Sequence, residues 1–166
     1  QLLWNSFRGS GYDIACAQNN SPIFYQLSDK KPMIEKVDFN PNFKQNLFFV
    51  HLNQKQDSKK GIAKFRQTKE NISQQIHDIS VISDGFLNAK SLLDFEKLMI
   101  EHEKIISSII QQKPVKSELF PDYFGEIKSL GAWGGDFVLA TGNEKSIGYF
   151  KNKGFDTVLG FEKMIL

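Results

Sequence analysis

The chain has 166 residues, of which 40% are hydrophobic and 24% charged, a composition typical of globular proteins with enough length to bury a core. The 21 lysine and arginine residues against 19 aspartate and glutamate residues leave a net charge of +2, too balanced for a nucleic-acid-binding surface. The apolar runs are too short for a transmembrane helix, and the single cysteine, Cys16, excludes an internal disulfide and favours a reducing, cytoplasmic location.

The N-terminal part of the chain predicts a short helix followed by a hairpin. Residues 13–19 are expected to form a helix that ends at the Asn-Asn-Ser-Pro sequence of residues 19–22. Residues 23–27 and 33–37 are apolar segments on either side of a polar turn, residues 28–32, and predict two paired strands.

The middle of the chain predicts one buried strand and then helices. Residues 47–52 are apolar on both faces, which is typical of a strand in the middle of a sheet. A short helix is expected over residues 58–67, a longer one from residue 68 or 71, and another from the capping box at residues 91–94. The apolar faces of the two longer helices are Ile72, Ile76, Ile79, Ile82 and Phe86 in the first and Leu92, Phe95, Leu98, Met99, His102, Ile105, Ile106 and Ile109 in the second.

The C-terminal part alternates between helix and strand patterns. Residues 118–129 predict a helix and residues 137–140 a strand. Residues 144–153 predict a helix that stops at Gly154, and residues 155–159 predict the last strand.

Two glycine-bearing segments point to function. Residues 9–15 read Gly-Ser-Gly-Tyr-Asp-Ile-Ala, and residues 131–136 read Gly-Ala-Trp-Gly-Gly-Asp. Glycine permits close approach of a ligand, and the backbone N–H groups of such loops bind phosphates. Asp13 begins the predicted helix, where its carboxylate either acts as a general base or only complements the helix dipole. The second segment is either a loop that contacts phosphate or a structural turn. Asp136 either belongs to that phosphate-contacting loop or only caps the loop at the start of the next strand.

Both segments resemble motifs of the GHMP kinases, the superfamily of galactose, homoserine, mevalonate and phosphomevalonate kinases. Residues 10–15 resemble its Ser-Gly-x-Asp-x-Ala segment, in a Gly-Tyr-Asp-Ile-Ala variant that a subgroup of the superfamily carries. Residues 131–136 are similar to the Gly-Ala-Gly-Gly-Gly-Asp loop of the mevalonate and phosphomevalonate kinase branch. The resemblance spans nearly the whole chain.

The resemblance implies an enzyme that uses ATP and Mg²⁺ to phosphorylate a hydroxyl or phosphate of a small molecule, such as mevalonate or phosphomevalonate. Asp13 would be the catalytic base, and no metal ligand is predicted. Trp133 departs from the family pattern, which has glycine at that position, and its ring would wall the acceptor pocket or stack on a ligand. The substrate-binding residues would be Arg8, Ser10, Gly11 and Trp133, and the nucleotide phosphates would contact Gly131, Ala132, Gly134, Gly135 and Asp136.

The resemblance also implies an α+β fold. Residues 44–166 would form the family's C-terminal domain, a ferredoxin-like antiparallel sheet with helices mainly on one face and strands near residues 47–52, 136–141 and 155–159. Residues 1–43 would be the tail of the ribosomal-protein-like N-terminal domain, which makes that domain of the same protein an expected partner. The family's phosphate loop is not found among these 166 residues, so we expect the chain alone to lack kinase activity.

Two other functions remain open on the same fold. One is a ligand-binding or regulatory protein without catalysis, which the Trp133 departure favours. The other is an ATP-dependent reaction like that of diphosphomevalonate decarboxylase.

Several charged or titratable residues have ambiguous roles. Arg8 would face a substrate carboxylate or phosphate, or form a surface ion pair. A basic cluster near residue 58 either binds anions or is a solvated surface, and its members are Lys55, Lys59, Lys60, Lys64 and Arg66. The histidines His51, His77 and His102 lack metal-ligand spacing, so no site is assigned to them.

Overall fold

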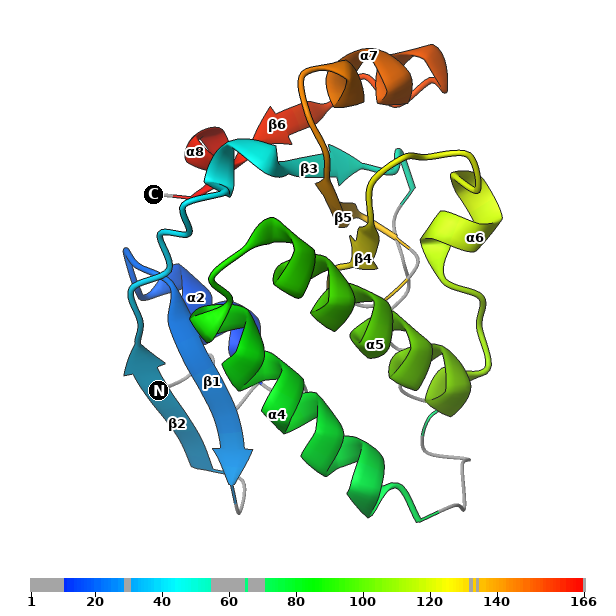
Figure 1. Cartoon of the computed structure of the whole chain (residues 1–166). Coiled ribbons are helices and arrows are strands. Elements are labelled where there is room, and N and C mark those ends of the chain that lie inside the picture. The colour runs from blue at the N-terminus through cyan, green and yellow to red at the C-terminus, as the bar shows by residue number, and fades with distance from the viewer. Residues whose placement is uncertain are drawn as a thin grey trace. The chain divides into compact units, whose positions relative to one another are not determined.

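The computed structural model describes residues 11–28, 31–54, 65, 71–131, 133 and 135–165. The chain forms two compact units, of which the second spans Pro41–Met164 and the first comprises the residues up to Asn40 together with Ile165 and Leu166. Both combine helices with antiparallel strands (Figure 1), so the predicted α+β class is confirmed. The basic cluster near residue 58 and the helix predicted over residues 58–67 lie outside the described residues, apart from Phe65.

The first unit contains a short helix and a hairpin, as predicted. Helix α2 (Tyr12–Ala17) begins after Gly11, whose φ of 82° is left-handed and therefore suits glycine. Strands β1 (Ile23–Ser28) and β2 (Lys31–Lys36) pair antiparallel, with Ile23 opposite Lys36. The predicted turn is too long, because Pro32 already lies within β2, opposite Leu27.

The second unit is built on one antiparallel sheet within the described residues. Its four strands have the order β4-β5-β3-β6, and their bounds are β3 (Leu47–His51), β4 (Ile127–Ser129), β5 (Phe137–Thr141) and β6 (Val158–Gly160). The 3-10 helix η1 precedes β3, and the α-helices connect or follow the strands: η1 (Lys44–Asn46), α4 (Ser73–Asn88), α5 (Leu92–Ile110), α6 (Val115–Leu119), α7 (Lys145–Asn152) and α8 (Phe161–Met164). The order along the chain is thus strand, helices, strand, strand, helix, strand.

The core of this unit lies against the middle of the sheet. Residues directly opposite each other in an antiparallel pair share a face, and Phe48 and Val50 of β3 lie opposite Ala140 and Val138 of β5. Their face is covered by α6, α7 and the segment between α6 and β4, through Val115, Phe120, Tyr123 and Phe150. Leu47, on the other face of β3, is also buried, which confirms a strand with two buried faces.

Helices α4 and α5 run side by side (Figure 1) and contact each other. The predicted N-cap is confirmed, because the Ser91 hydroxyl accepts a hydrogen bond of 3.1 Å from the Asp94 N–H at the start of α5 and donates one of 2.6 Å to the Asp94 carboxylate. Phe95 of α5 packs on Phe86 of α4, with ring centroids 4.8 Å apart. The predicted face of α4 is wrong near its start, where Ile76 is 59% exposed.

The segment 118–129 corrects one prediction, because it is not a helix. Helix α6 ends at Leu119, the next residue but one is Pro121, and Gly125 precedes strand β4. Proline and glycine interrupt helices, and the segment instead ends in β4, which pairs antiparallel with β5.

The C-terminal segment differs from prediction by a few residues. Strand β6 is displaced from the predicted 155–159 to Val158–Gly160, and helix α8 follows it without having been predicted. Helix α7 ends as predicted, because Gly154 adopts a left-handed φ of 90° directly after it.

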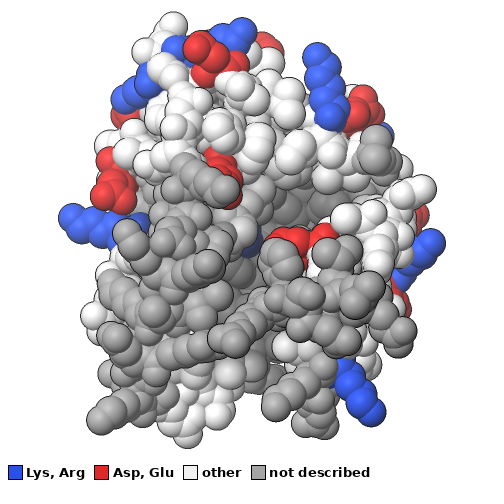
Figure 2. All heavy atoms as spheres, turned by 180° about the vertical axis from the view of Figure 1, so that it is seen from behind, with Lys and Arg blue, Asp and Glu red and all other residues white. Residues whose placement is uncertain are grey.

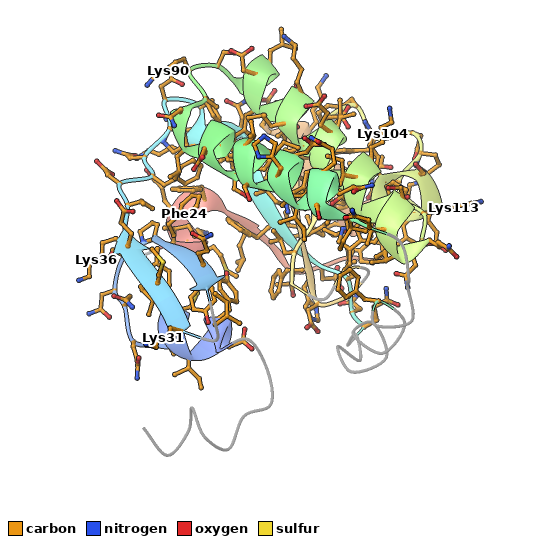
Figure 3. All side chains as sticks on the ribbon, turned by 90° about the horizontal axis from the view of Figure 1, so that it is seen from below. Phe24, Lys31, Lys36, Lys90, Lys104 and Lys113 are labelled. Carbon is orange, nitrogen blue, oxygen red and sulfur yellow. The ribbon has the colours of Figure 1, made fainter. Side chains whose placement is uncertain are left out.

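The described surface carries charges of both signs. On the face in Figure 2, lysine, arginine, aspartate and glutamate side chains are interspersed, in line with the net charge of +2. Figure 3 shows Lys31 and Lys36 projecting from the hairpin, and Lys90, Lys104 and Lys113 projecting around α4 and α5. In the part of the chain that the structure describes, no helix has the length and apolar character needed to cross a bilayer.

Gly125 supports a prediction about the close approach of two backbone segments. A Cβ at this position would collide with the backbone carbonyl of Thr141 at the end of β5. Gly125→Ala is therefore expected to lower the free energy of unfolding by about 1–3 kcal/mol, measured by urea denaturation. Gly148→Ala is the matched control, since it lies in α7 with no described atom near its Cβ, and should stabilise by about 0.5–1 kcal/mol. Equal free energies of unfolding for Gly125→Ala and Gly148→Ala would contradict the close approach of Gly125 to the Thr141 backbone.

Candidate functional site

Asp13 lies in the first turn of α2, where the sequence motif predicted it. Gly11 is buried at the N-cap position, while Asp13 is exposed to solvent. Tyr12 stands beside it, and burial, a hydrogen bond with Cys16 and the nearby Asp13 carboxylate raise the pKa of Tyr12 to about 12. The phenol next to Asp13 is therefore neutral at physiological pH.

Other predicted site residues fall outside the described part of the chain. These are Arg8, Ser10, Ala132 and Gly134. The described members divide between the two units, with Gly11 and Asp13 in the first and residues 131, 133, 135 and 136 in the second.

The glycine loop, residues 130–136, connects β4 to β5 through several left-handed positions. The φ angles are 61° at Gly131, 55° at Trp133 and 52° at Asp136. A large side chain seldom adopts such a φ, so the glycine that the family pattern has at position 133 fits the backbone conformation found here. The loop ends are fixed by hydrogen bonds, with Leu130 N–H donating to Phe137 and Asp136 N–H donating to Gln54, at 3.2 and 2.8 Å.

The Trp133 side chain is buried, with 6% exposure, and its indole N–H donates a 3.1 Å hydrogen bond to Oε1 of Glu103. Glu103 belongs to α5 and is itself 4% exposed. The same carboxylate accepts from the Ser129 N–H and the Ser129 hydroxyl, each at 3.1 Å. One buried carboxylate therefore joins α5 to the end of β4 and to the middle of the glycine loop. The contact of Trp133 with substrate stays a prediction.

Two basic side chains lie close to this carboxylate. Burial lowers the pKa of Lys128, an effect that the charge of Glu103 opposes. The Lys128 ammonium donates a 3.2 Å hydrogen bond to the Ser129 carbonyl. His102 places its Nδ1 3.7 Å from Oε1 of Glu103, and burial lowers the pKa of His102 below its ordinary 6.5.

The His102 shift predicts a pH dependence of stability. Because the folded state holds His102 neutral, the unfolded chain binds the proton more readily below pH 6.5. The contribution of the neutral His102 to the free energy of unfolding is therefore fully present above pH 6.5. It declines as the pH falls below that value, by at most about 1.4 kcal/mol per pH unit for one group. Urea denaturation between pH 7 and pH 5 checks this, and His102→Gln should flatten the decline. An equally steep decline in that variant would assign the effect to other groups.

The remaining two histidines lie apart from the Glu103 carboxylate, on β3 and α4. The His51 ring packs at a tilt of 57° against Phe137 in the neighbouring strand, and its Nδ1 accepts a hydrogen bond from the Asn53 N–H. His77 is exposed on α4. Among the described residues, no group of three or more histidine, cysteine, aspartate or glutamate side chains is arranged to hold a metal ion.

Glu103 is the site residue that the sequence reasoning missed. It lies one turn beyond Met99 on the side of α5 that also buries Phe95. A glutamate that continues an apolar stripe at four-residue spacing was the available signal, because a buried carboxylate requires hydrogen-bond partners.

Comparison with known proteins supports the fold. The chain matches no protein-family model and no curated protein sequence. Its structure is similar to the crystal structure of L. major mevalonate kinase in complex with R-mevalonate, with a TM-score of 0.68 and 15% identity, covering 93% of this chain and 52% of that one. The chain thus spans about half the length of that kinase. The predicted resemblance to this kinase superfamily is confirmed at the level of the fold.

Proposed function

We propose that the protein containing this chain is an ATP-dependent kinase that phosphorylates a small molecule. The proposal is carried by the agreement of two observations, the fold of the chain and the position of the motif within it. The chain is similar to half of a mevalonate kinase, and Asp13 follows a left-handed Gly11 at the start of a helix within the segment that resembles the kinase motif.

The element order supports the finer architecture. In the second unit, the strand, helices, strand, strand, helix, strand order and the sheet order β4-β5-β3-β6 correspond to a ferredoxin-like arrangement. On this proposal the second unit is the C-terminal domain of the kinase fold. The helix and hairpin of the first unit are then the tail of the N-terminal domain, and the proposed boundary moves from residue 44 to the division between Asn40 and Pro41.

Asp13 is proposed as the general base. Phosphoryl transfer requires the attacking hydroxyl to be positioned and its proton to be accepted, and an exposed carboxylate can do both. The left-handed Gly11 turns the chain sharply into α2 and thereby fixes where the Asp13 backbone lies. In this role Asp13 orients the acceptor hydroxyl and takes its proton.

The glycine loop is proposed to contact the phosphates of ATP or of the acceptor. Gly131 is exposed, and no described atom lies within 4 Å of the place a Cβ would occupy there. An open left-handed position of this kind lets a ligand approach the backbone closely. ATP would supply the phosphoryl group. Mg²⁺ would accompany the ATP, and no residue of this chain is assigned to hold it.

Trp133 favours a second function, a protein on this fold that binds the ligand without transferring phosphate. Its ring replaces a glycine of the family pattern and is buried beside Glu103. In this second function the loop keeps its architecture and Asp13 has no catalytic part.

The test incubates the whole protein that contains this chain with ATP, Mg²⁺ and either mevalonate or phosphomevalonate. Phosphorus NMR then follows the transfer of phosphate, and calorimetry follows binding. A phosphorylated acceptor supports the kinase, whereas binding of either acceptor without ATP consumption supports the binding protein. In a further incubation with diphosphomevalonate and ATP, release of carbon dioxide would indicate the decarboxylase-like reaction. An absence of both binding and turnover contradicts the proposal.

A further inference from the structure

We propose that Glu103 is a positioning residue, which holds the glycine loop in its left-handed conformation through Trp133 and Ser129. The proposal rests on the proposed function in one respect, namely that the loop contacts phosphate. The physical link between Glu103 and the loop stands on hydrogen bonds and burial alone.

The loop needs such support because its backbone is strained. Trp133 and Asp136 have φ angles of 55° and 52°, a region that side chains with a Cβ seldom occupy. Conformations of this kind persist only where the surrounding structure holds them. The hydrogen bonds of Leu130 and Asp136 hold the two ends of the loop but not its middle.

Glu103 supports the middle of the loop at Trp133. Its Oε1 accepts from the Trp133 indole and from the Ser129 N–H, and its Oε2 accepts from the Ser129 hydroxyl, all at 3.1 Å. The residues Glu103 and Trp133 are 4% and 6% exposed, so water does not readily replace either partner. Through one carboxylate, the residue before the loop and the residue at its centre share the same anchor.

The anchor is itself on a rigid element. Helix α5 is capped at Ser91 and buries Phe95 and Met99 on the side that carries Glu103. A carboxylate fixed on a packed helix orients a loop more accurately than one on another loop would. Trp133, which stands where the family pattern has glycine, thus provides an indole N–H donor that glycine lacks. Glu103 accepts the hydrogen bond from this N–H.

The chemistry of the contact supplies a matched set of variants. In Glu103→Gln the amide oxygen can still accept from Trp133 and Ser129 N–H, while its NH₂ group can donate to the Ser129 hydroxyl. Glu103→Leu removes all of these bonds. Glu101→Leu makes the same change at an exposed position of α5 and is the control.

The first measurement is hydrogen exchange of the loop amides at residues 133–136, referred to those of β3. Glu103→Leu should raise the loop exchange about tenfold with β3 unchanged, Glu103→Gln by less than about threefold, and Glu101→Leu not at all. Equal loop exchange in Glu103→Leu and the parent protein overturns the proposal. If Glu103→Leu loses β3 protection, Trp133→Phe and Ser129→Ala replace it, and unchanged loop exchange in both overturns the proposal.

The second measurement is kinetic and separates this proposal from the kinase proposal. If the loop binds phosphate, Glu103→Leu should raise the KM for ATP about tenfold with a smaller change in kcat, and Glu103→Gln should recover most of the parent KM. If Glu103→Leu exchanges rapidly in the loop but keeps the parent KM for ATP, Glu103 positions the loop and the loop has no part in ATP binding. A parent protein without any turnover rejects the kinase, while the exchange measurement still decides whether Glu103 positions the loop.

Discussion

The Asp13→Asn variant of the proposed kinase is expected to lose about 10²–10⁴-fold in kcat, because an amide cannot accept the proton of the attacking hydroxyl. Binding of ATP should remain close to that of the parent protein, since the substitution preserves the shape of the side chain. Asp13 is exposed in the first turn of α2, so the fold itself does not depend on burying it. Initial-rate kinetics and calorimetric titration with ATP give the two quantities.

The control separates catalysis from electrostatic support of the helix. A carboxylate in the first turn stabilises a helix by about 0.3–1 kcal/mol, which Asp13→Asn would also remove. Asp38→Asn removes another exposed carboxylate from the same unit and should leave kcat unchanged. A small loss of stability with unchanged turnover in Asp13→Asn would restrict Asp13 to the helix dipole and remove the catalytic role.

The elements predicted correctly are those whose signals are local. The start of α5 follows from the Ser91 hydroxyl and the Asp94 N–H, three residues apart. The end of α7 follows from Gly154, which alone supplies the left-handed residue that stops the helix. Strand β3 follows from the continuous apolar run of residues 47–50.

Strand β4 could not be predicted in this way, because its cause lies elsewhere in the chain. Its three residues are too few to show a period of two, and they pair with residues 138–140 of β5. Tyr123 adds a second distant contact, since its hydroxyl donates to the Thr141 carbonyl and lies 2.8 Å from it. The helix predicted over residues 118–129 does not form, because strand pairing with a distant segment overrides the local helix pattern. A single sequence does not reveal that pairing.

The candidate site shows the same division. Gly11 and Asp13 are adjacent enough to form a recognisable motif, and the structure places them at the start of a helix as predicted. The contact between Glu103 and Trp133 joins residues 30 positions apart and has no local signature. The sequence marked Trp133 as a departure from a pattern and placed Glu103 in an apolar stripe of α5, but only the structure shows that the two are partners.

Trp133→Gly, which restores the residue of the family pattern, is expected to destabilise this protein. Glycine relieves the left-handed strain at φ 55°, a gain of about 1 kcal/mol. Loss of a buried aromatic ring costs about 3–5 kcal/mol, and the Trp133 side chain is only 6% exposed. The loss exceeds the gain, so the free energy of unfolding should fall by about 2–4 kcal/mol in urea denaturation.

Trp133→Phe is the matched variant, because it keeps most of the ring and removes only the N–H that Glu103 accepts. Its expected cost is about 1–2 kcal/mol, below that of glycine. A Trp133→Gly variant as stable as the parent would mean that the family glycine fits this loop without compensation. The expected order, parent above phenylalanine above glycine, would instead mean that the loop and α5 are adapted to each other. In that case the departure at position 133 cannot be reversed without also changing Glu103, which would be left buried with one donor fewer.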